Sequence, residues 1–167
     1  MKRVGVIALA SVLATAGCAA QSRDTQSVVD DVKVVDHAGM VSEYHGLADR
    51  YPNPLPSGIR FPSGMPAAEE PTMYEVGEGA NRADSFWICA WMGEWLKWRR
   101  TDAAAAAVAW RWVEAADRTQ LHREHYYDPR DVWHQNILEP ARAGDVGTFR
   151  EFYTTSCGYP GLPKITS

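Results

Sequence analysis

Residues 86–100 read F-W-I-C-A-W-M-G-E-W-L-K-W-R-R. On an α-helix, where each residue advances by about 100°, four tryptophans of this stretch fall within roughly 80° of one another. They are Trp87, Trp91, Trp95 and Trp98. Lys97 and Arg100 lie toward the opposite side. The stretch therefore predicts an amphipathic helix of about four turns.

A second helix is expected directly after the first. Residues 102–119 read D-A-A-A-A-A-V-A-W-R-W-V-E-A-A-D-R-T, and alanine is the strongest helix former. Asp84 or Ser85 is placed to cap the first helix, and Thr101 or Asp102 the second. Because the connection is short, we expect an antiparallel helical hairpin in which the small alanines let the second helix approach the indoles closely.

The tryptophan stripe has two interpretations. Burying one indole removes about 200 Å² from water and contributes about 4 kcal/mol. Net domain stability is only about 5–15 kcal/mol, so a small domain needs most of these rings in its core. The alternative is a ligand surface for sugars or a partner helix, formed by Trp87, Trp91, Trp95 and Trp98. We favour the core, with room for one or two partly exposed rings.

Length and charge limit the possible classes of protein. A chain of 167 residues is long enough for one domain. The formal net charge is −4, and the basic residues are scattered instead of forming a dense patch. Nucleic-acid binding is therefore not expected, and neither is tight attachment to anionic lipid by charge.

The first residues have the pattern of an export signal. Residues 1–17 place a short basic start before an apolar run, Val4 to Ala16, that is too short to span a bilayer. The run leads into Ala16-Gly17-Cys18, which resembles the lipobox of bacterial lipoproteins. The resemblance implies cleavage before Cys18, lipid on its sulfur, and anchoring to the outer face of the cytoplasmic membrane. Plain secretion, after cleavage before Gly17, is the alternative.

Domain boundaries follow from composition. Residues 18–50 begin with small polar residues and predict a lipidated tether with an N-terminal segment whose structure the pattern leaves open. Residues 51–167 predict a single helical domain that starts with an extended, Pro/Gly-rich segment. That segment repeats an apolar-Pro-Ser-Gly-apolar unit, so we expect two tight turns that press Leu55, Ile59, Phe61 and Met65 onto the helices.

Two cysteines remain if Cys18 carries lipid. An even pair in an exported protein indicates a disulfide, here between Cys89 and Cys157. The bridge would pin the C-terminal tail to the tryptophan-rich helix. A catalytic or redox thiol is the alternative, and neither cysteine has the C-x-x-C neighbour that would favour it.

Histidines and carboxylates gather between residues 121 and 134. His122, His125, Asp128 and His134 could hold zinc with a position left for water, which is the arrangement of a metal-dependent hydrolase. The H-x-x-H spacing is a weak signal. Histidines that end a helix also interact favourably with its terminal carbonyls, and we prefer that interpretation, with no cofactor.

Two further helices are expected after this segment. One covers Asp131 to Arg142 with Asp131 as its cap, and the other covers Val146 to Thr154 with Asp145 as its cap. The predicted fold class is thus mainly α, a small helical domain built on an antiparallel helical hairpin.

The sequence contains no nucleophile elbow, catalytic triad pattern or phosphate-binding loop. Its W-x-C-x-W-x-x-x-W helix with a late cysteine resembles small exported proteins of high-GC Gram-positive bacteria, a likeness that supplies no activity. We expect a non-catalytic binding or structural module whose partners are the membrane, through the lipid, and an envelope protein or cell-wall component. The alternative is the extracellular hydrolase that would use the segment from His122 to His134.

Overall fold

The structure is a computed structural model that describes residues 32–66, 70–125, 128 and 130–165, with the side chain of His125 left out. The expected leader, Cys18 and the tether up to residue 31 lie outside the described residues. Within the described ranges the chain is mainly helical, as the sequence predicts. None of the helices described there combines the length and the apolar character that crossing a membrane requires.

Most secondary-structure elements of the described residues are helices. A two-stranded antiparallel ribbon pairs β1 (Val34–Val35) with β2 (Tyr74–Glu75). The α-helices are α2 (His37–Ala48), α3 (Glu78–Trp98), α4 (Ala103–Glu114), α5 (Glu139–Arg142) and α6 (Gly147–Ser156). A 3-10 helix, η1 (Ala115–Arg118), and two π-helical segments, η2 (Leu121–His125) and η3 (Trp133–Leu138), lie between α4 and α5.

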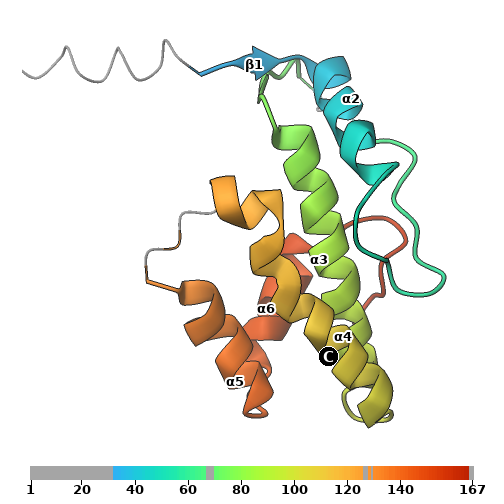
Figure 1. The fold of residues 1–167 in the computed structure, drawn as a ribbon, viewed down its shortest axis with the longest axis vertical. Coiled ribbons are helices and arrows are strands. Elements are labelled where there is room, and N and C mark those ends of the chain that lie inside the picture. The colour runs from blue at the N-terminus through green and yellow to red at the C-terminus, as the bar shows by residue number, and fades with distance from the viewer. Residues whose placement is uncertain (1–31, 67–69, 126–127, 129, 166–167) are drawn as a thin grey trace, which may run out of the picture. The chain divides into compact units, whose positions relative to one another are not determined.

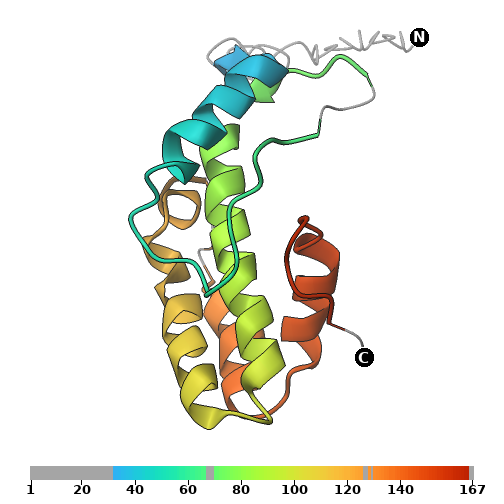
Figure 2. The ribbon, with the colours of Figure 1, turned by 90° about the vertical axis from the view of Figure 1, so that its right-hand side faces the viewer.

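The expected helical hairpin is present. Helices α3 and α4 run side by side in opposite directions and are joined by residues 99–102 (Figures 1 and 2). A side-chain oxygen of Asp102 accepts the backbone N–H groups of Ala104 and Ala105, at 3.0 and 2.9 Å, which confirms one of the two expected caps. Ala106 and Ala109 are buried against α3, because a methyl group lets the two backbones approach.

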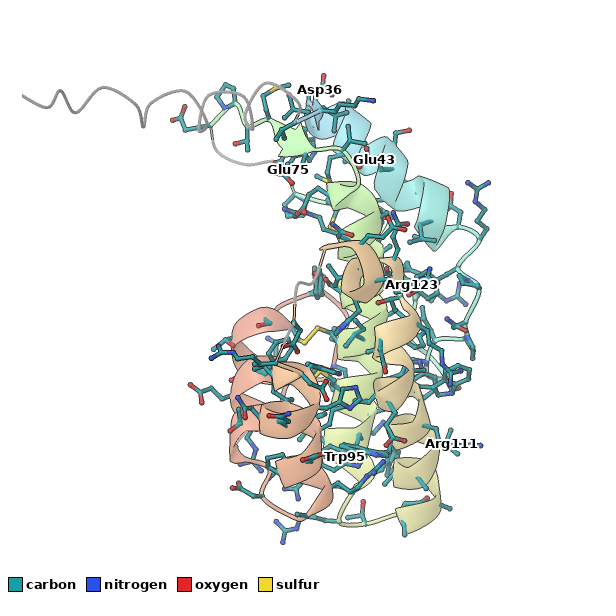
Figure 3. All side chains as sticks on the ribbon, turned by 60° about the vertical axis from the view of Figure 1, so that its left-hand side comes forward. Asp36, Glu43, Glu75, Trp95, Arg111 and Arg123 are labelled. Carbon is teal, nitrogen blue, oxygen red and sulfur yellow. A yellow bond between two sulfur atoms is a disulfide. The ribbon has the colours of Figure 1, made fainter. Side chains whose placement is uncertain are left out.

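The first helix begins earlier than predicted. It starts at Glu78, after Gly77 in a left-handed conformation (φ 97°), so neither Asp84 nor Ser85 caps it. The cap comes from α2, where the carboxylate of Glu43 accepts the N–H groups of Gly77 and Gly79, at 3.0 and 3.2 Å (Figure 3). A carboxylate at a helix N-terminus also interacts favourably with the helix dipole.

The proline-rich segment packs on the helices as expected. The first of the two expected turns is present, since the N–H of Ile59 donates to the carbonyl of Pro56 at 3.0 Å and Gly58 has φ 82°. The second unit, residues 61–65, forms no such turn. Met65 is buried, and the other three apolar residues of the repeat are partly buried against the core. They are Leu55, Ile59 and Phe61.

One carbonyl of this segment binds two buried indoles. The Nε1–H groups of Trp87 and Trp91 both donate to the carbonyl oxygen of Pro54, at 2.8 and 3.0 Å. The two rings stand one helical turn apart, which brings their N–H groups to the same side. The carbonyl has two lone pairs and can accept both, so neither indole leaves an unpaired donor in the core.

The later helices differ from prediction at their starts. Asp131 has φ 53° and does not cap the third helix. Asp128 caps it instead, because its two oxygens accept the N–H groups of Val132 and Trp133 at 2.7 and 2.8 Å. The expected fourth helix is α6. Its N-cap position is held by Val146, so Asp145 is not the cap that the sequence predicts, although its carboxylate accepts the N–H of Gly147 at 3.1 Å.

Candidate binding site

A cavity of about 100 Å³ lies beside the tryptophan-rich helix. Its wall comes from α3, η2, η3, α6 and the C-terminal tail. The apolar part of the wall consists of Ile88, Cys89, Leu121, Trp133 and Phe152. We call this space the inner cavity.

Four polar side chains complete the wall of the inner cavity: Ser85, His122, Ser156 and Tyr159. Burial raises the pKa of the Tyr159 hydroxyl, and this effect outweighs the opposing hydrogen bond from Ser85 and the nearby Arg82. Tyr159 also contacts the ring of Phe86 edge-on, with 5.6 Å between centroids. The hydroxyl groups in the wall are therefore neutral at physiological pH.

His122 contributes an imidazole ring to the wall of the inner cavity. Its ring meets that of Trp133 edge to face, with 5.3 Å between centroids. Burial of the imidazole holds the pKa of His122 below its ordinary value, although the carboxylates of Asp117 and Asp84 act in the opposite direction. The imidazole is therefore mainly uncharged at neutral pH.

A second, open hollow adjoins the inner cavity. Ser85, Leu121 and Tyr159 line both spaces, so only a few side chains separate them. The remaining wall of this outer hollow is polar, with Glu75, Glu78, Asn81 and Arg82. Arg82 pairs with Glu78 at 2.8 Å. The side-chain oxygen of Asn81 is buried and has no hydrogen-bond partner among the described residues.

Asp84 holds the region around the site together. It is buried, with 3% of its surface exposed. One carboxylate oxygen accepts the hydroxyl of Tyr51 at 2.6 Å, and the other accepts the backbone N–H of Leu121 at 2.9 Å. Burial raises the pKa of Tyr51, and the hydrogen bond to Asp84 adds to the increase, so the phenol stays a donor. One carboxylate thereby fixes the start of η2, on which His122 lies.

The predicted disulfide joins Cys89 on α3 to Cys157 at the end of α6 (Figure 3). The Cα atoms are 5.4 Å apart. Cys89 lines the inner cavity, and Cys157 stands two residues before Tyr159. The bridge therefore holds the tail that closes one side of the cavity.

The tryptophan stripe is mainly core. Trp87, Trp91 and Trp95 are 0, 7 and 8% exposed, so these three do not offer a ligand surface. Trp98 is partly buried, and its indole N–H donates to Glu94 at 2.7 Å. Indoles of α4 cover the stripe, because Trp112 stacks on Trp91 and Trp110 packs on Trp95.

The residues considered for zinc have other roles where their side chains are described. Both oxygens of Asp128 accept backbone N–H groups. His134 lies 3.4 Å from Asp117 on η1, and His122 contributes to the inner cavity. The side chain of His125 lies outside the described residues. Among the described side chains, no group of three or more histidine, cysteine or acidic residues is placed to hold a metal ion.

Sequence reasoning identified only part of this site. The sequence suggests only a helix-capping role for Ser85, and Tyr159 and Asn81 belong to no recognisable motif. The one available signal was position, since Ser85 and Ile88 lie one turn apart beside the tryptophan stripe. Which other elements meet that face depends on the packing of α6 and the tail.

Comparison of the chain with protein-family models, curated proteins and solved structures finds no match.

Proposed function

We propose that the mature protein is a non-catalytic binding module of the bacterial cell envelope, anchored to the outer face of the cytoplasmic membrane by lipid on Cys18. The observation that carries the binding role is the inner cavity, where apolar side chains surround a few neutral polar groups. Small-molecule sites in proteins commonly have this composition. The polar outer hollow beside it could contact a polar part of the same ligand.

Two features support the location. The leader ends in Ala16-Gly17-Cys18, the pattern that resembles a lipobox. The Cys89–Cys157 disulfide fits an oxidising compartment, because such bonds are rare where thiols are kept reduced.

Mass spectrometry of the protein extracted from cells that express the full chain tests the anchor. The expected result is an N-terminal Cys18 carrying diacylglycerol, in protein recovered with the membranes. Replacement Cys18→Ser should remove the lipid. A mature N-terminus at Gly17, in protein recovered from the medium, would favour plain secretion and overturn the anchor.

Binding is tested separately with the mature protein that carries Cys18→Ser and therefore no lipid. We expect lipid extracts or cell-wall fragments to shift its thermal unfolding midpoint and its tryptophan fluorescence. Ser85→Leu, which places a larger side chain in the cavity wall, should abolish the shift. Arg111→Gln, an exposed change on α4 outside the cavity wall, is the matched control. Absence of a shift with every envelope fraction would contradict a binding role.

A further inference from the structure

We propose that the site binds a small uncharged amphiphile, whose apolar end of about six carbons fills the inner cavity and whose hydroxyl or amide N–H donates to Asn81 in the outer hollow. This inference rests on the binding function proposed above and names the chemical class of the ligand.

The volume of the inner cavity limits how large the apolar end of the ligand can be. Its volume is about 100 Å³. An engineered apolar cavity of about 150 Å³ in another protein stays dry and takes up benzene. A space somewhat smaller than that suits a short alkyl segment or a single small ring, and it is too small to enclose a whole disaccharide or a whole long acyl chain.

The wall of the inner cavity selects against charge. Ile88, Leu121 and Phe152 supply apolar surface, and the Cys89 side chain is fixed in the disulfide. His122 is mainly uncharged at neutral pH because burial lowers its pKa. The residues that line the cavity in the described part of the chain include no carboxylate, lysine or arginine, so an ionised group entering it would lose its hydration without a counter-ion in direct contact, which is costly. The carboxylates of Asp84 and Asp117 near His122 would add to the penalty for an anion.

The outer hollow supplies the polar contact. The Asn81 oxygen is buried and lacks a hydrogen-bond donor among the described residues, and an unmet buried acceptor is unfavourable. Arg82, a cation in the wall of the outer hollow, is paired with Glu78 on the same helix. Asn81 lines the outer hollow, and a small rotation of its amide would bring the covered oxygen to a ligand hydroxyl or amide N–H without disturbing that ion pair. Since Ser85, Leu121 and Tyr159 border both spaces, one short molecule can reach from one to the other.

Three probes of equal chain length test this inference on the mature protein with Cys18→Ser: 1-hexanol, hexanoate and hexylammonium, titrated at pH 7 by tryptophan fluorescence and thermal shift. We expect 1-hexanol to bind at least about tenfold more tightly than either ion, because of the cost of burying charge. Equal or tighter binding of hexanoate or hexylammonium would overturn the uncharged class. Failure of all three would overturn the size assignment.

Two variants assign the binding to the site. Ser85→Leu should abolish 1-hexanol binding, whereas Asn81→Ala should weaken 1-hexanol several-fold and leave benzene, which has no donor, unaffected. Unchanged 1-hexanol binding in Ser85→Leu would place the probe elsewhere and overturn the inference. Each variant is first checked for wild-type circular dichroism and an intact disulfide. Ser85→Ala serves as the folding control for Ser85→Leu.

The outcomes separate the two proposals. One outcome is that envelope fractions shift the unfolding midpoint and fluorescence of the wild-type protein but not of Ser85→Leu, while a charged probe binds more tightly than 1-hexanol. The proposed binding function is then supported and the proposed ligand class is wrong. If neither the fractions nor the three probes nor benzene bind, both proposals fail.

Discussion

At the scale of single residues, Asp84 connects parts of the chain that are far apart in sequence. Its carboxylate accepts hydrogen bonds from Tyr51, at the start of the proline-rich segment, and from Leu121, at the start of η2. Hydrogen bonds to charged groups are stronger than neutral ones and leave a costly unmet donor when one partner is lost. A buried carboxylate in this position stabilises the fold only while both donors remain.

We therefore expect Asp84→Asn to lower the free energy of unfolding by about 1–3 kcal/mol, because an amide presents an N–H where a second acceptor is needed. Urea unfolding followed by fluorescence measures the change. Asp102→Asn is the matched control, since asparagine caps a helix about as well as aspartate and should change stability little. Equal losses at the two positions would contradict a special role for Asp84.

His122 makes stability depend on pH. Its pKa in the folded protein is lowered by burial, so the unfolded chain binds a proton more readily than the folded one. The stabilisation from the neutral imidazole is therefore present above the unfolded pKa and is lost as pH falls through the folded pKa. Asp117, Asp84 and Asp128 oppose the shift, and His134 adds to it.

The expected result is a thermal unfolding midpoint that falls from pH 7.5 to pH 5 (the chosen range spans the ordinary histidine pKa of about 6.5). The fall should be shallower in His122→Gln, whose side chain does not titrate. The difference between the two curves isolates His122 from the other histidines. Parallel curves would show that His122 titrates alike in both states.

At the scale of elements, a glycine allows α2 and α3 to cross closely. A Cβ atom added at Gly79 would lie 2.6 Å from the backbone nitrogen of Tyr44 and still closer to the carbonyl oxygen of Met40. The same backbone carries one of the two N–H groups that Glu43 caps. Close approach and capping therefore depend on the same residue.

We expect Gly79→Ala to destabilise the protein by about 1–3 kcal/mol, because the two helices must move apart. Gly46→Ala on α2 is the matched control, since no atom lies within 4 Å of the added Cβ. That change should be neutral or stabilise by up to about 1 kcal/mol, since alanine favours a helix over glycine. Chemical denaturation of the two variants measures both effects, and a tolerated Gly79→Ala would disprove the close crossing.

At the scale of the whole molecule, the disulfide links the central helix to the tail across 68 residues. In the chain-entropy model, opening a loop of that length costs about 4 kcal/mol of stability. The double variant Cys89→Ala, Cys157→Ala should therefore unfold at clearly lower urea concentration than the wild type. It should also lose 1-hexanol binding, because Tyr159 would no longer be held beside the cavity. Unchanged stability and binding in the double variant would show that packing alone fixes the tail.

The sequence by itself determined the helical hairpin, the burial of three of the four tryptophans in its first helix, the pairing of Cys89 with Cys157 and the packing of the proline-rich repeat. Each of these follows from local periodicity, local turn residues or the parity of cysteines, which are visible in a single chain. The cap at Asp102 belongs to the same class, since the side chain acts two and three residues away.

Only the tertiary structure decided where α3 begins, what Asp84 does and which residues enclose the inner cavity. Glu43 caps a helix more than thirty residues away, and Asp84 joins Tyr51 to Leu121 over comparable distances. Side-chain donors and acceptors that serve such distant partners leave no spacing pattern in the sequence. Cavities arise in the same way, because their shape depends on how separate elements pack and not on any one of them.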